Sequence, residues 1–351
     1  MAQCRAARWR QDQLTASGPA RAARPGFRLA CTGLVFAAAV VCGACSSVHL
    51  GKPVECTAAA ADPPPPAGTA DNDASLKIVT WNLHGTPDTA PMEARIRRVS
   101  GKLLAQDADI VLLQEVWFAG DARMLANGLA ARYDQVEDDK AVLSGFLWPI
   151  VETRRGGLLA FVRKNGRWRL RGPSVFTEFE ARAPFWKLSE LDGLAAKGIQ
   201  RFEVESGQLR LIVLNTHLQA QYGKERPYET ERRAQVAQLH RSALSALGDG
   251  ARAVLIAAGD FNTLPDESRV LSELATQWKD VTASFREACN CGTLLTADSR
   301  EGAWIDYAFI RMPAAGRYRV KSVERIPSAS IDCPYSDHHG LQVGLEISFQ
   351  R

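Results

Sequence analysis

The stretch that most constrains this fold is an apolar run that ends abruptly in two polar residues. Residues 253–258 are all apolar, as in a buried strand, and Gly259 ends the run just before Asp260 and Asn262. Side chains two residues apart in an extended chain point to the same side, so the carboxylate and the carboxamide are expected to lie together. Such a pair can hold water and anionic oxygens, as phosphate chemistry requires. A strand followed by a turn is the simpler explanation of this stretch taken alone.

The same pattern recurs along the chain, where apolar segments lead into polar or ionisable residues. Six such groups follow in this order: Asn82, Glu115, His217, Asp260 with Asn262, Asp306, and Asp337 with His338. Asp306 lies inside an expected strand over 303–310, a costly place for a carboxylate without a partner. Each group has a structural explanation on its own, such as a solvated strand end. Together they indicate one convergent site with carboxylates for a hard cation, amides for anionic oxygens and histidines for proton transfer.

The spacing of apolar residues also predicts helices between these strands. Helices are expected over residues 92–103, 121–133 and 227–247, and further strands over 141–147 and 156–163. Strands and helices that alternate with short connections favour a sheet covered by helices.

The first 45 residues are expected to be a signal peptide and not part of the fold. Arginines are frequent among residues 5–28, and the apolar run 34–41 that follows suits the core of a signal peptide but is short for a membrane span. The sequence Cys42-Gly-Ala-Cys45 resembles a bacterial lipoprotein signal, which implies a lipid anchor at Cys45 and a place in the bacterial cell envelope. An ordinary secretory signal cut nearby is the alternative.

Residues 46–75 are expected to form a disordered tether, because they are rich in alanine and proline and have no apolar period. The folded domain is expected to span residues 76–351. The composition, with 46% hydrophobic and 23% charged residues, is ordinary for a soluble globular protein. The formal net charge of +4 owes much to the N-terminal arginines, so charge indicates no evident nucleic-acid patch.

Four cysteines remain after the expected signal and lipid site: Cys56, Cys289, Cys291 and Cys333. Disulfides can persist in an exported protein, and Cys289-Asn-Cys291 lacks the spacing of a common zinc site. A bridge from Cys289 or Cys291 to Cys333 is the simplest expectation, although the sequence does not determine the pairing.

Six ordered motifs carry a resemblance to the endonuclease/exonuclease/phosphatase superfamily: Trp81-Asn82, Gln114-Glu115, Asn215-Thr-His217, Gly259-Asp-Phe-Asn262, Ile305-Asp306 and Ser336-Asp-His338. The resemblance covers essentially all of residues 76–351. It implies an α/β fold, a four-layer sandwich of two packed mixed β-sheets flanked by helices. It also implies a hydrolase of phosphoester bonds that uses Mg2+, for which Mn2+ can substitute. We expect the protein to be a monomer.

The resemblance further implies a metal ligand and a general base. Glu115 is expected to be the main metal ligand, helped by Asn82. His338 is expected to activate water as the general base, oriented by Asp337 or Asp306. These residue types suit the chemistry, because the ordinary pKa of histidine lies near neutrality and Mg2+ on a carboxylate supplies positive charge.

The remaining matched residues are expected to contact the substrate. By the same resemblance, Asp260 and Asn262 position the water and the phosphoryl group, and His217 faces the phosphate as an acid or a hydrogen-bond donor. The adjacent His339 has no assigned role.

Two stretches are similar to the neutral sphingomyelinase branch of the superfamily: Asn215-Thr-His-Leu-Gln-Ala220, and Asp192-Gly-Leu-Ala-Ala-Lys197 with Gly198. That similarity implies a phospholipid headgroup phosphodiester as substrate, with Asp192 and Lys197 in a loop that orders the site. A solvated loop pair explains the same two residues. An envelope nuclease or a phosphatase for another phosphorylated compound is the alternative enzyme. A binding protein on the same fold is a third possibility, although such a protein would be expected to have lost Glu115 or His338.

Overall fold

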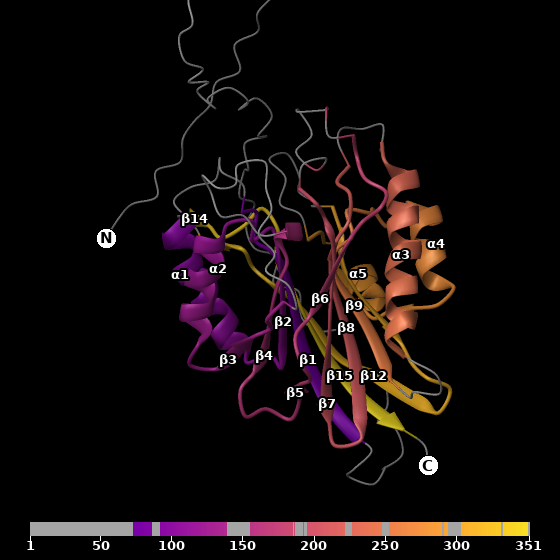
Figure 1. Ribbon diagram of the computed structural model, residues 1–351, viewed down its shortest axis with the longest axis horizontal. Helices are drawn as coiled ribbons and strands as arrows, with labels where there is room; N and C mark the ends of the chain where they lie inside the picture. The colour runs from indigo at the N-terminus through magenta and orange to yellow at the C-terminus, as the bar shows by residue number, and fades with distance from the viewer. Residues whose placement is uncertain are drawn as a thin grey trace, which may run out of the picture.

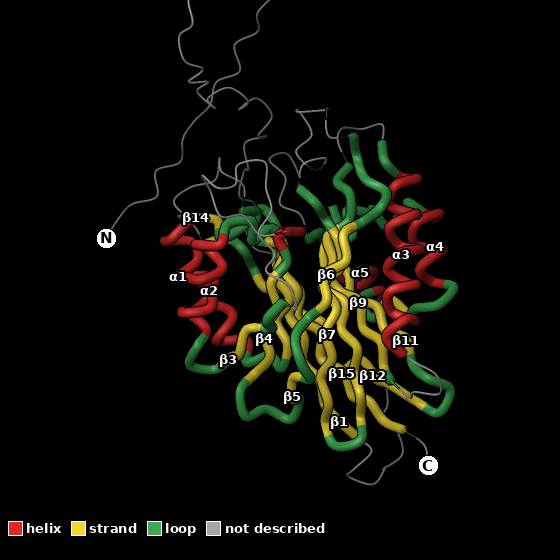
Figure 2. The backbone as a smooth tube through the Cα atoms, in the orientation of Figure 1, coloured by secondary structure: helices red, strands yellow, loops and turns green. Residues whose placement is uncertain are grey.

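The structure is a computed structural model that describes residues 73–85, 92–138, 155–184, 186, 192, 195–221, 227–247, 253–289, 291–293, 303–330 and 333–349. Within these residues, two mixed sheets pack face to face and helices cover their outer faces (Figure 1). Helices α1 and α2 flank the first sheet, and α3 and α4 flank the second (Figures 1 and 2). The predicted four-layer α/β sandwich is confirmed.

The first sheet has six strands in the order β12-β15-β1-β2-β4-β3, with β1 and β2 parallel. Its strands are β1 Asp73–Asn82, β2 Ile110–Gln114, β3 Tyr133–Gln135, β4 Leu159–Arg163, β12 Gly316–Ile326 and β15 Gly340–Phe349. The second sheet has the order β10-β11-β9-β8-β7-β5, with β6 paired to β7 and with β8 and β9 parallel. Its strands are β5 Arg169–Leu170, β6 Val175–Glu178, β7 Gly198–Ser206, β8 Leu209–His217, β9 Val254–Asp260, β10 Lys279–Asp280 and β11 Asp306–Arg311.

The remaining described elements are short or helical. The helices are α1 Met92–Gln106, α2 Ala119–Leu129, α3 Glu229–Leu247, α4 Ser268–Ala275 and α5 Ala283–Cys289, with a 3-10 turn at Arg155–Gly157. A small hairpin pairs β13 (Ala329–Ser330) with β14 (Cys333–Pro334). No helix in the described part of the chain is both long and apolar enough to cross a membrane.

The central strands are apolar throughout because both of their faces are buried. Along β2, Ile110 and Leu112 pack between the two sheets, whereas Val111 and Leu113 pack against α1 and α2. All five residues of β2 and all seven of β9 are buried. Alternate residues of a strand point to opposite faces, so a strand covered on both sides must be apolar at every position.

Several boundaries differ from the sequence prediction. Strand β1 begins at Asp73, not Leu76, because residues 73–75 already pair with Ser348 to Glu346 of β15. The helix expected over 121–133 instead covers Ala119–Leu129, and Tyr133 starts β3 by pairing with Arg163. The expected strand 141–147, the signal and the tether before Asp73 lie outside the described residues.

The expected disulfide to Cys333 is wrong. Cys289, the last residue of α5, is bonded to Cys291, and their Cα atoms are 5.2 Å apart. Because helix α5 ends at Cys289, the chain turns there and returns the second thiol to the first within two residues. Neither sulfur is therefore left to bond Cys333.

Candidate active site

Strand pairing brings the ends of five strands together at one edge of the sandwich. In the first sheet, Asn82 of β1 lies opposite Gln114 of β2, so Asn82 and Glu115 leave adjacent strands side by side. In the second sheet, Asp260 of β9 lies between His217 of β8 and Asp306 of β11. The two sheets then meet through the amide of Asn82, which donates to Asp260, 178 residues away, at 3.0 Å.

Two of these residues have a left-handed backbone at the point where a strand ends. The φ angles are 58° at Glu115 and 46° at Asn262. A residue with a Cβ pays about 1–2 kcal/mol for this conformation, and such strain is concentrated at functional sites. Gly259 has φ 149°, and a Cβ there would collide with the carbonyl oxygen of Thr216. Glycine therefore lets β9 approach β8 closely just before Asp260.

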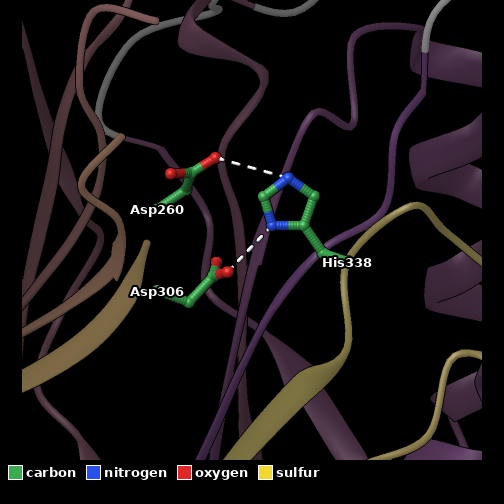
Figure 3. A group of neighbouring side chains, drawn as sticks. All are labelled: Asp260, Asp306 and His338. Carbon is green, nitrogen blue, oxygen red and sulfur yellow. Dashed lines mark hydrogen bonds and ion pairs between the residues drawn. The ribbon is translucent and has the colours of Figure 1, made fainter. Parts of the chain in front are cut away.

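His338 lies between two buried carboxylates (Figure 3). Its Nδ1 is 2.8 Å from Oδ2 of Asp306, and its Nε2 is 3.7 Å from Oδ2 of Asp260. Asp337, the other expected partner, is 4.0 Å from Nε2, is partly exposed, and has His84 Nδ1 at 3.5 Å. Asp306 is thus the residue that orients the ring, and it is the first residue of β11, not an interior one as predicted.

The surroundings of His338 and Asp260 change their acidity. Burial lowers the pKa of His338, but the charge and hydrogen bond of Asp306, with Asp337 and Asp260, raise that pKa well above its usual value. Burial, reinforced by the charge of Asp306, raises the pKa of Asp260 to about 7 against the attraction of His338 and Lys197. The imidazole is therefore a base strong enough to take a proton from a neighbouring donor.

The loop that carries His338 is tied to the first sheet by three hydrogen bonds. Trp81 Nε1 donates to the His338 carbonyl at 2.9 Å, and Ser336 Oγ donates to the Asn82 carbonyl at 2.6 Å. The backbone N–H of His338 donates to Ser336 Oγ at 3.0 Å. These bonds explain why the serine precedes the Asp-His pair in the motif.

Asn82 joins the carboxylates of both sheets. Its Nδ2 donates to Oε1 of Glu115 and to Oδ2 of Asp260, each at 3.0 Å, and its Oδ1 accepts the N–H of His84. Asn262 closes the other side, where its N–H donates to Oδ1 of Asp260 at 2.8 Å. The Nδ2 of Asn262 donates to the carbonyl of Leu218 at 3.0 Å.

Lys197 and Asp192 form a buried pair inside the site and not a solvated loop pair. Lys197 Nζ is 2.8 Å from Asp192 Oδ2, 2.8 Å from His217 Nε2 and 3.0 Å from the Leu218 carbonyl. Burial, Lys197 and His338 lower the pKa of His217 well below its usual value. His217 is therefore neutral, and an ammonium donating to its Nε2 leaves the ring proton on Nδ1. In this tautomer the Nδ1–H of His217 is available as a hydrogen-bond donor.

Two supporting residues were not identified from the sequence. Gln219 Nε2 donates to Asp192 Oδ2 at 2.9 Å, and the Ala220 N–H donates to the same oxygen at 2.5 Å. The Thr293 hydroxyl accepts the N–H groups of Ile305 and Asp306 at 3.0 and 3.2 Å. Gln219 lies within the stretch Asn215–Ala220 that is similar to the neutral sphingomyelinase branch, so the sequence could have indicated it as a site residue. Thr293 lies in no motif that we identified.

His339 is structural and does not reach the carboxylates of the site. Its Nδ1 accepts the N–H of Ser328 at 3.1 Å, and its own N–H donates to the Thr293 carbonyl at 2.7 Å. Burial, with the positive charges of Arg325 and His338, lowers the pKa of His339 to about 3. The ring is therefore neutral and holds the segment that leads into β13.

The buried oxygens of the site fit a hard divalent cation. Oε2 of Glu115 and Oδ1 of Asp306 are buried without a hydrogen-bond partner in the described structure. One donor atom each from Asp260, Asp306 and His338 lie within 4.8 Å of one another. Buried carboxylate oxygens without donors are costly unless a cation or a proton compensates them.

The family follows from a match to a known sequence pattern. Residues 79–338 match the model of the Endonuclease/Exonuclease/phosphatase family, and this match spans both sheets and all six motifs. The chain belongs to this family.

Two curated relatives of this family member carry phospholipase or sphingomyelinase names. The Inositol phosphosphingolipids phospholipase C of Schizosaccharomyces pombe is 27% identical over 321 residues, covering 78% of this chain and 69% of the relative. The Putative neutral sphingomyelinase of Drosophila melanogaster is 24% identical over 287 residues, covering 78% and 61%. The chain therefore spans under two thirds of the second relative's length.

Solved structures share the fold of this family member. TDP2 of D. rerio, complexed with single strand DNA product, is 20% identical with a TM-score of 0.56, over 78% of this chain and 99% of that one. Sphingomyelinase C from Streptomyces griseocarneus is 20% identical with a TM-score of 0.53, over 77% and 99%. At such identities these likenesses concern the fold alone.

Proposed function

We propose that this chain is a Mg2+-dependent phosphodiesterase that hydrolyses a phospholipid headgroup in the manner of a sphingomyelinase. The single observation that carries the proposal is the contact of Lys197 with His217 at 2.8 Å, inside a site that also holds the His338–Asp306 pair. The names of the two curated relatives favour the same substrate class.

In this proposal His338 is the general base. Its Nε2 takes a proton from a water molecule whose oxygen attacks phosphorus, while Asp306 stabilises the imidazolium that forms. Asp260, 3.7 Å from Nε2, orients that water. The phosphorus–oxygen bond to the lipid alcohol breaks, the alcohol oxygen takes a proton from solvent water, and the His338 imidazolium returns its proton to solvent.

On the other side of the site, His217 carries a hydrogen-bond donor for a non-bridging phosphoryl oxygen, and Lys197 holds the His217 ring in place through its contact with Nε2 at 2.8 Å. Nδ1 of His217 is buried without a hydrogen-bond partner in the described structure, so it is available to donate to a substrate oxygen. Asp192 holds Lys197 in place at 2.8 Å. Asn262 supports the shared Leu218 carbonyl, which accepts from both Lys197 and Asn262.

Glu115, helped by Asn82, would hold the metal. Asn82 donates to Oε1 of Glu115 at 3.0 Å, whereas Oε2 of Glu115 is buried without a hydrogen-bond partner in the described structure. This second oxygen supports the choice of Glu115, because it is available to a metal ion. When bound, Mg2+ supplies positive charge to the developing phosphoryl anion, and Mn2+ would serve the same purpose.

The test is product release by the purified protein, with Mg2+ or with a chelator. Sphingomyelin, an inositol phosphosphingolipid, phosphatidylcholine and single-stranded DNA are offered separately, with His338→Ala as the control. We expect metal-dependent release of a phosphorylated headgroup from a sphingolipid and none from His338→Ala. Cleavage of DNA alone would instead identify a nuclease, and no metal-dependent hydrolysis of any phosphodiester would overturn the proposal.

We also propose that the protein is a monomer anchored in the bacterial envelope through lipid at Cys45. The support is the sequence Cys42-Gly-Ala-Cys45 after an apolar run. Labelling with a fatty acid in a bacterial host tests it: label on the full chain that is absent from Cys45→Ser is expected. A soluble, unlabelled protein cut near residue 45 would favour an ordinary secretory signal.

A further inference from the structure

A buried arginine on α1 contacts both loops that lead to the active site. Arg95 is 5% exposed. Its Nη2 donates to the carbonyls of Leu83 and His84, the latter at 3.1 Å, and its Nε donates to the carbonyl of Tyr335 at 3.1 Å. Leu83 directly follows Asn82, and Tyr335 lies three residues before His338.

The same guanidinium faces the strand end that carries Glu115. Arg95, Glu115, Leu83, Tyr335 and Asp121 all line one small internal cavity of about 10 Å³. Asp121, on α2, is 7% exposed, and its Oδ2 is buried without a hydrogen-bond partner. Burial raises the pKa of Asp121, and the charge of Arg95 opposes that rise. The buried cation therefore has a nearby anion, which a group in this position requires.

We propose that Arg95 is a positioning residue that sets the distance between the loop that follows Asn82 and the loop carrying His338. The inference rests on the proposed function for its activity readout only. One planar guanidinium joins the carbonyls of Leu83 and His84 to the carbonyl of Tyr335, which belongs to a loop far away in sequence. A lysine has a single ammonium on a flexible stem and cannot hold three carbonyls in one plane.

The placement matters because hydrolysis needs the base and the phosphorus in one geometry. His338 Nε2 is already 3.7 Å from Asp260, and Asn82 donates to Asp260 at 3.0 Å. Because both residues contact Asp260, a shift of one loop against the other changes at least one of these two distances. A displacement of about 1 Å at reacting groups lowers a rate by roughly a hundredfold.

The experiment compares Arg95→Lys with Arg163→Lys in the full chain. Arg163 of β4 is the control, because it also joins segments, through Asp107 and Asp109, but at the opposite end of β2 from Glu115 and with a side chain that is 28% exposed. For Arg95→Lys we expect kcat to fall about 10- to 100-fold with KM within about threefold of the native value. For Arg163→Lys we expect kcat to change by less than about threefold.

A second readout does not depend on activity. In protein labelled with 15N-histidine, the His338 resonance is identified by its loss in His338→Ala. We expect that resonance to move in Arg95→Lys and to stay in place in Arg163→Lys. If the native protein hydrolyses no phosphodiester, the proposed function fails, and the resonance still decides the role of Arg95.

Chemical rescue addresses a variant that loses stability. In Arg95→Ala, added guanidinium at millimolar concentration is expected to restore part of kcat, or the native His338 resonance, and to do neither in Arg163→Ala. The proposal is overturned if kcat and the His338 resonance of Arg95→Lys match the native protein. It is also overturned if Arg95→Ala and Arg163→Ala respond alike to guanidinium.

Discussion

Replacing Asp306 by asparagine tests the proposed general base most directly. The substitution keeps the size of a side chain that is 1% exposed, but it removes the charge that is 2.8 Å from His338 Nδ1. A hydrogen bond between charged partners contributes about 1.5–3 kcal/mol, and its loss lowers the pKa of His338.

The same free energy sets the expected loss of rate. Asp306 stabilises the imidazolium, which forms in the transition state, so about 1.5–3 kcal/mol of lost stabilisation lowers kcat about 10- to 150-fold. The direction of the pH effect is also determined. The base must be unprotonated, and a lower pKa of His338 moves the acidic limb of the pH–rate profile to lower pH.

The assay is kcat against pH for the native protein, Asp306→Asn and His338→Ala. A kcat of Asp306→Asn within threefold of native at every pH, or an acidic limb that moves to higher pH, would refute the reasoning. A titration of kcat with Mg2+ tests the alternative that the metal ligands are Asp306, Asp260 and His338. In that case Asp306→Asn raises the half-saturating Mg2+ concentration, whereas we expect it to be unchanged.

Three further predictions concern the other site residues. Glu115→Gln should raise the half-saturating Mg2+ concentration at least tenfold by calorimetry, because an amide is a weaker ligand than a carboxylate; an unchanged affinity would place the metal elsewhere. Lys197→Met should lower the free energy of unfolding by about 3–5 kcal/mol, because it leaves Asp192 buried without its cation. The double variant Lys197→Met, Asp192→Asn should regain this stability but not the native kcat. Recovery of kcat in the double variant would contradict the proposed role of Lys197. Asp260→Asn should be inactive, yet in metal-free protein at pH 8 it should be more stable by at most about 4 kcal/mol, since the pKa of the buried carboxyl rises from 3.8 to about 7. Because the pKa of Asp260 is raised in the folded state, the native protein loses stability as the pH rises from about 4 to about 7. Urea titrations should therefore show the difference in the free energy of unfolding between Asp260→Asn and the native protein vanishing below about pH 4. A difference that does not depend on pH would contradict the raised pKa of Asp260.

The strands and their exits could be predicted from sequence because each is an apolar run ended by a polar residue. Residues 253–258 predicted β9, and the structure has it as Val254–Asp260. The prediction that a helix runs to Tyr133 was wrong at its C-terminal end, because α2 ends at Leu129. Helical periodicity continues past Leu129, but Tyr133 pairs with Arg163 in β3, and that partner is 30 positions away. Local pattern does not contain such a contact.

The choice between the two candidate partners of His338 also needed the structure. Asp337 is adjacent in sequence, whereas Asp306 comes from a different strand of the other sheet. Sequence proximity does not determine which carboxylate faces an imidazole. The disulfide failed for a related reason, since pairing depends on where helix α5 ends. Arg95 and Thr293 act through backbone carbonyls and N–H groups, and these contacts leave no motif.

Strand β1 runs from the start of the domain at Asp73 to the candidate active site at Asn82. In an anchored protein, this strand would determine how the active site is oriented relative to the anchor. Asp73 lies beside Ser348 near the C-terminal end, whereas Asn82 lies in the site at the other end of the same ten-residue strand, roughly 30 Å away. In the anchored form that we propose, the chain from Cys45 would enter the domain on the side opposite to the active site. Residues 46–72 span at most about 90 Å when fully extended. The length of that segment therefore governs whether the site can turn toward the anchoring leaflet or only meets lipid on a facing surface.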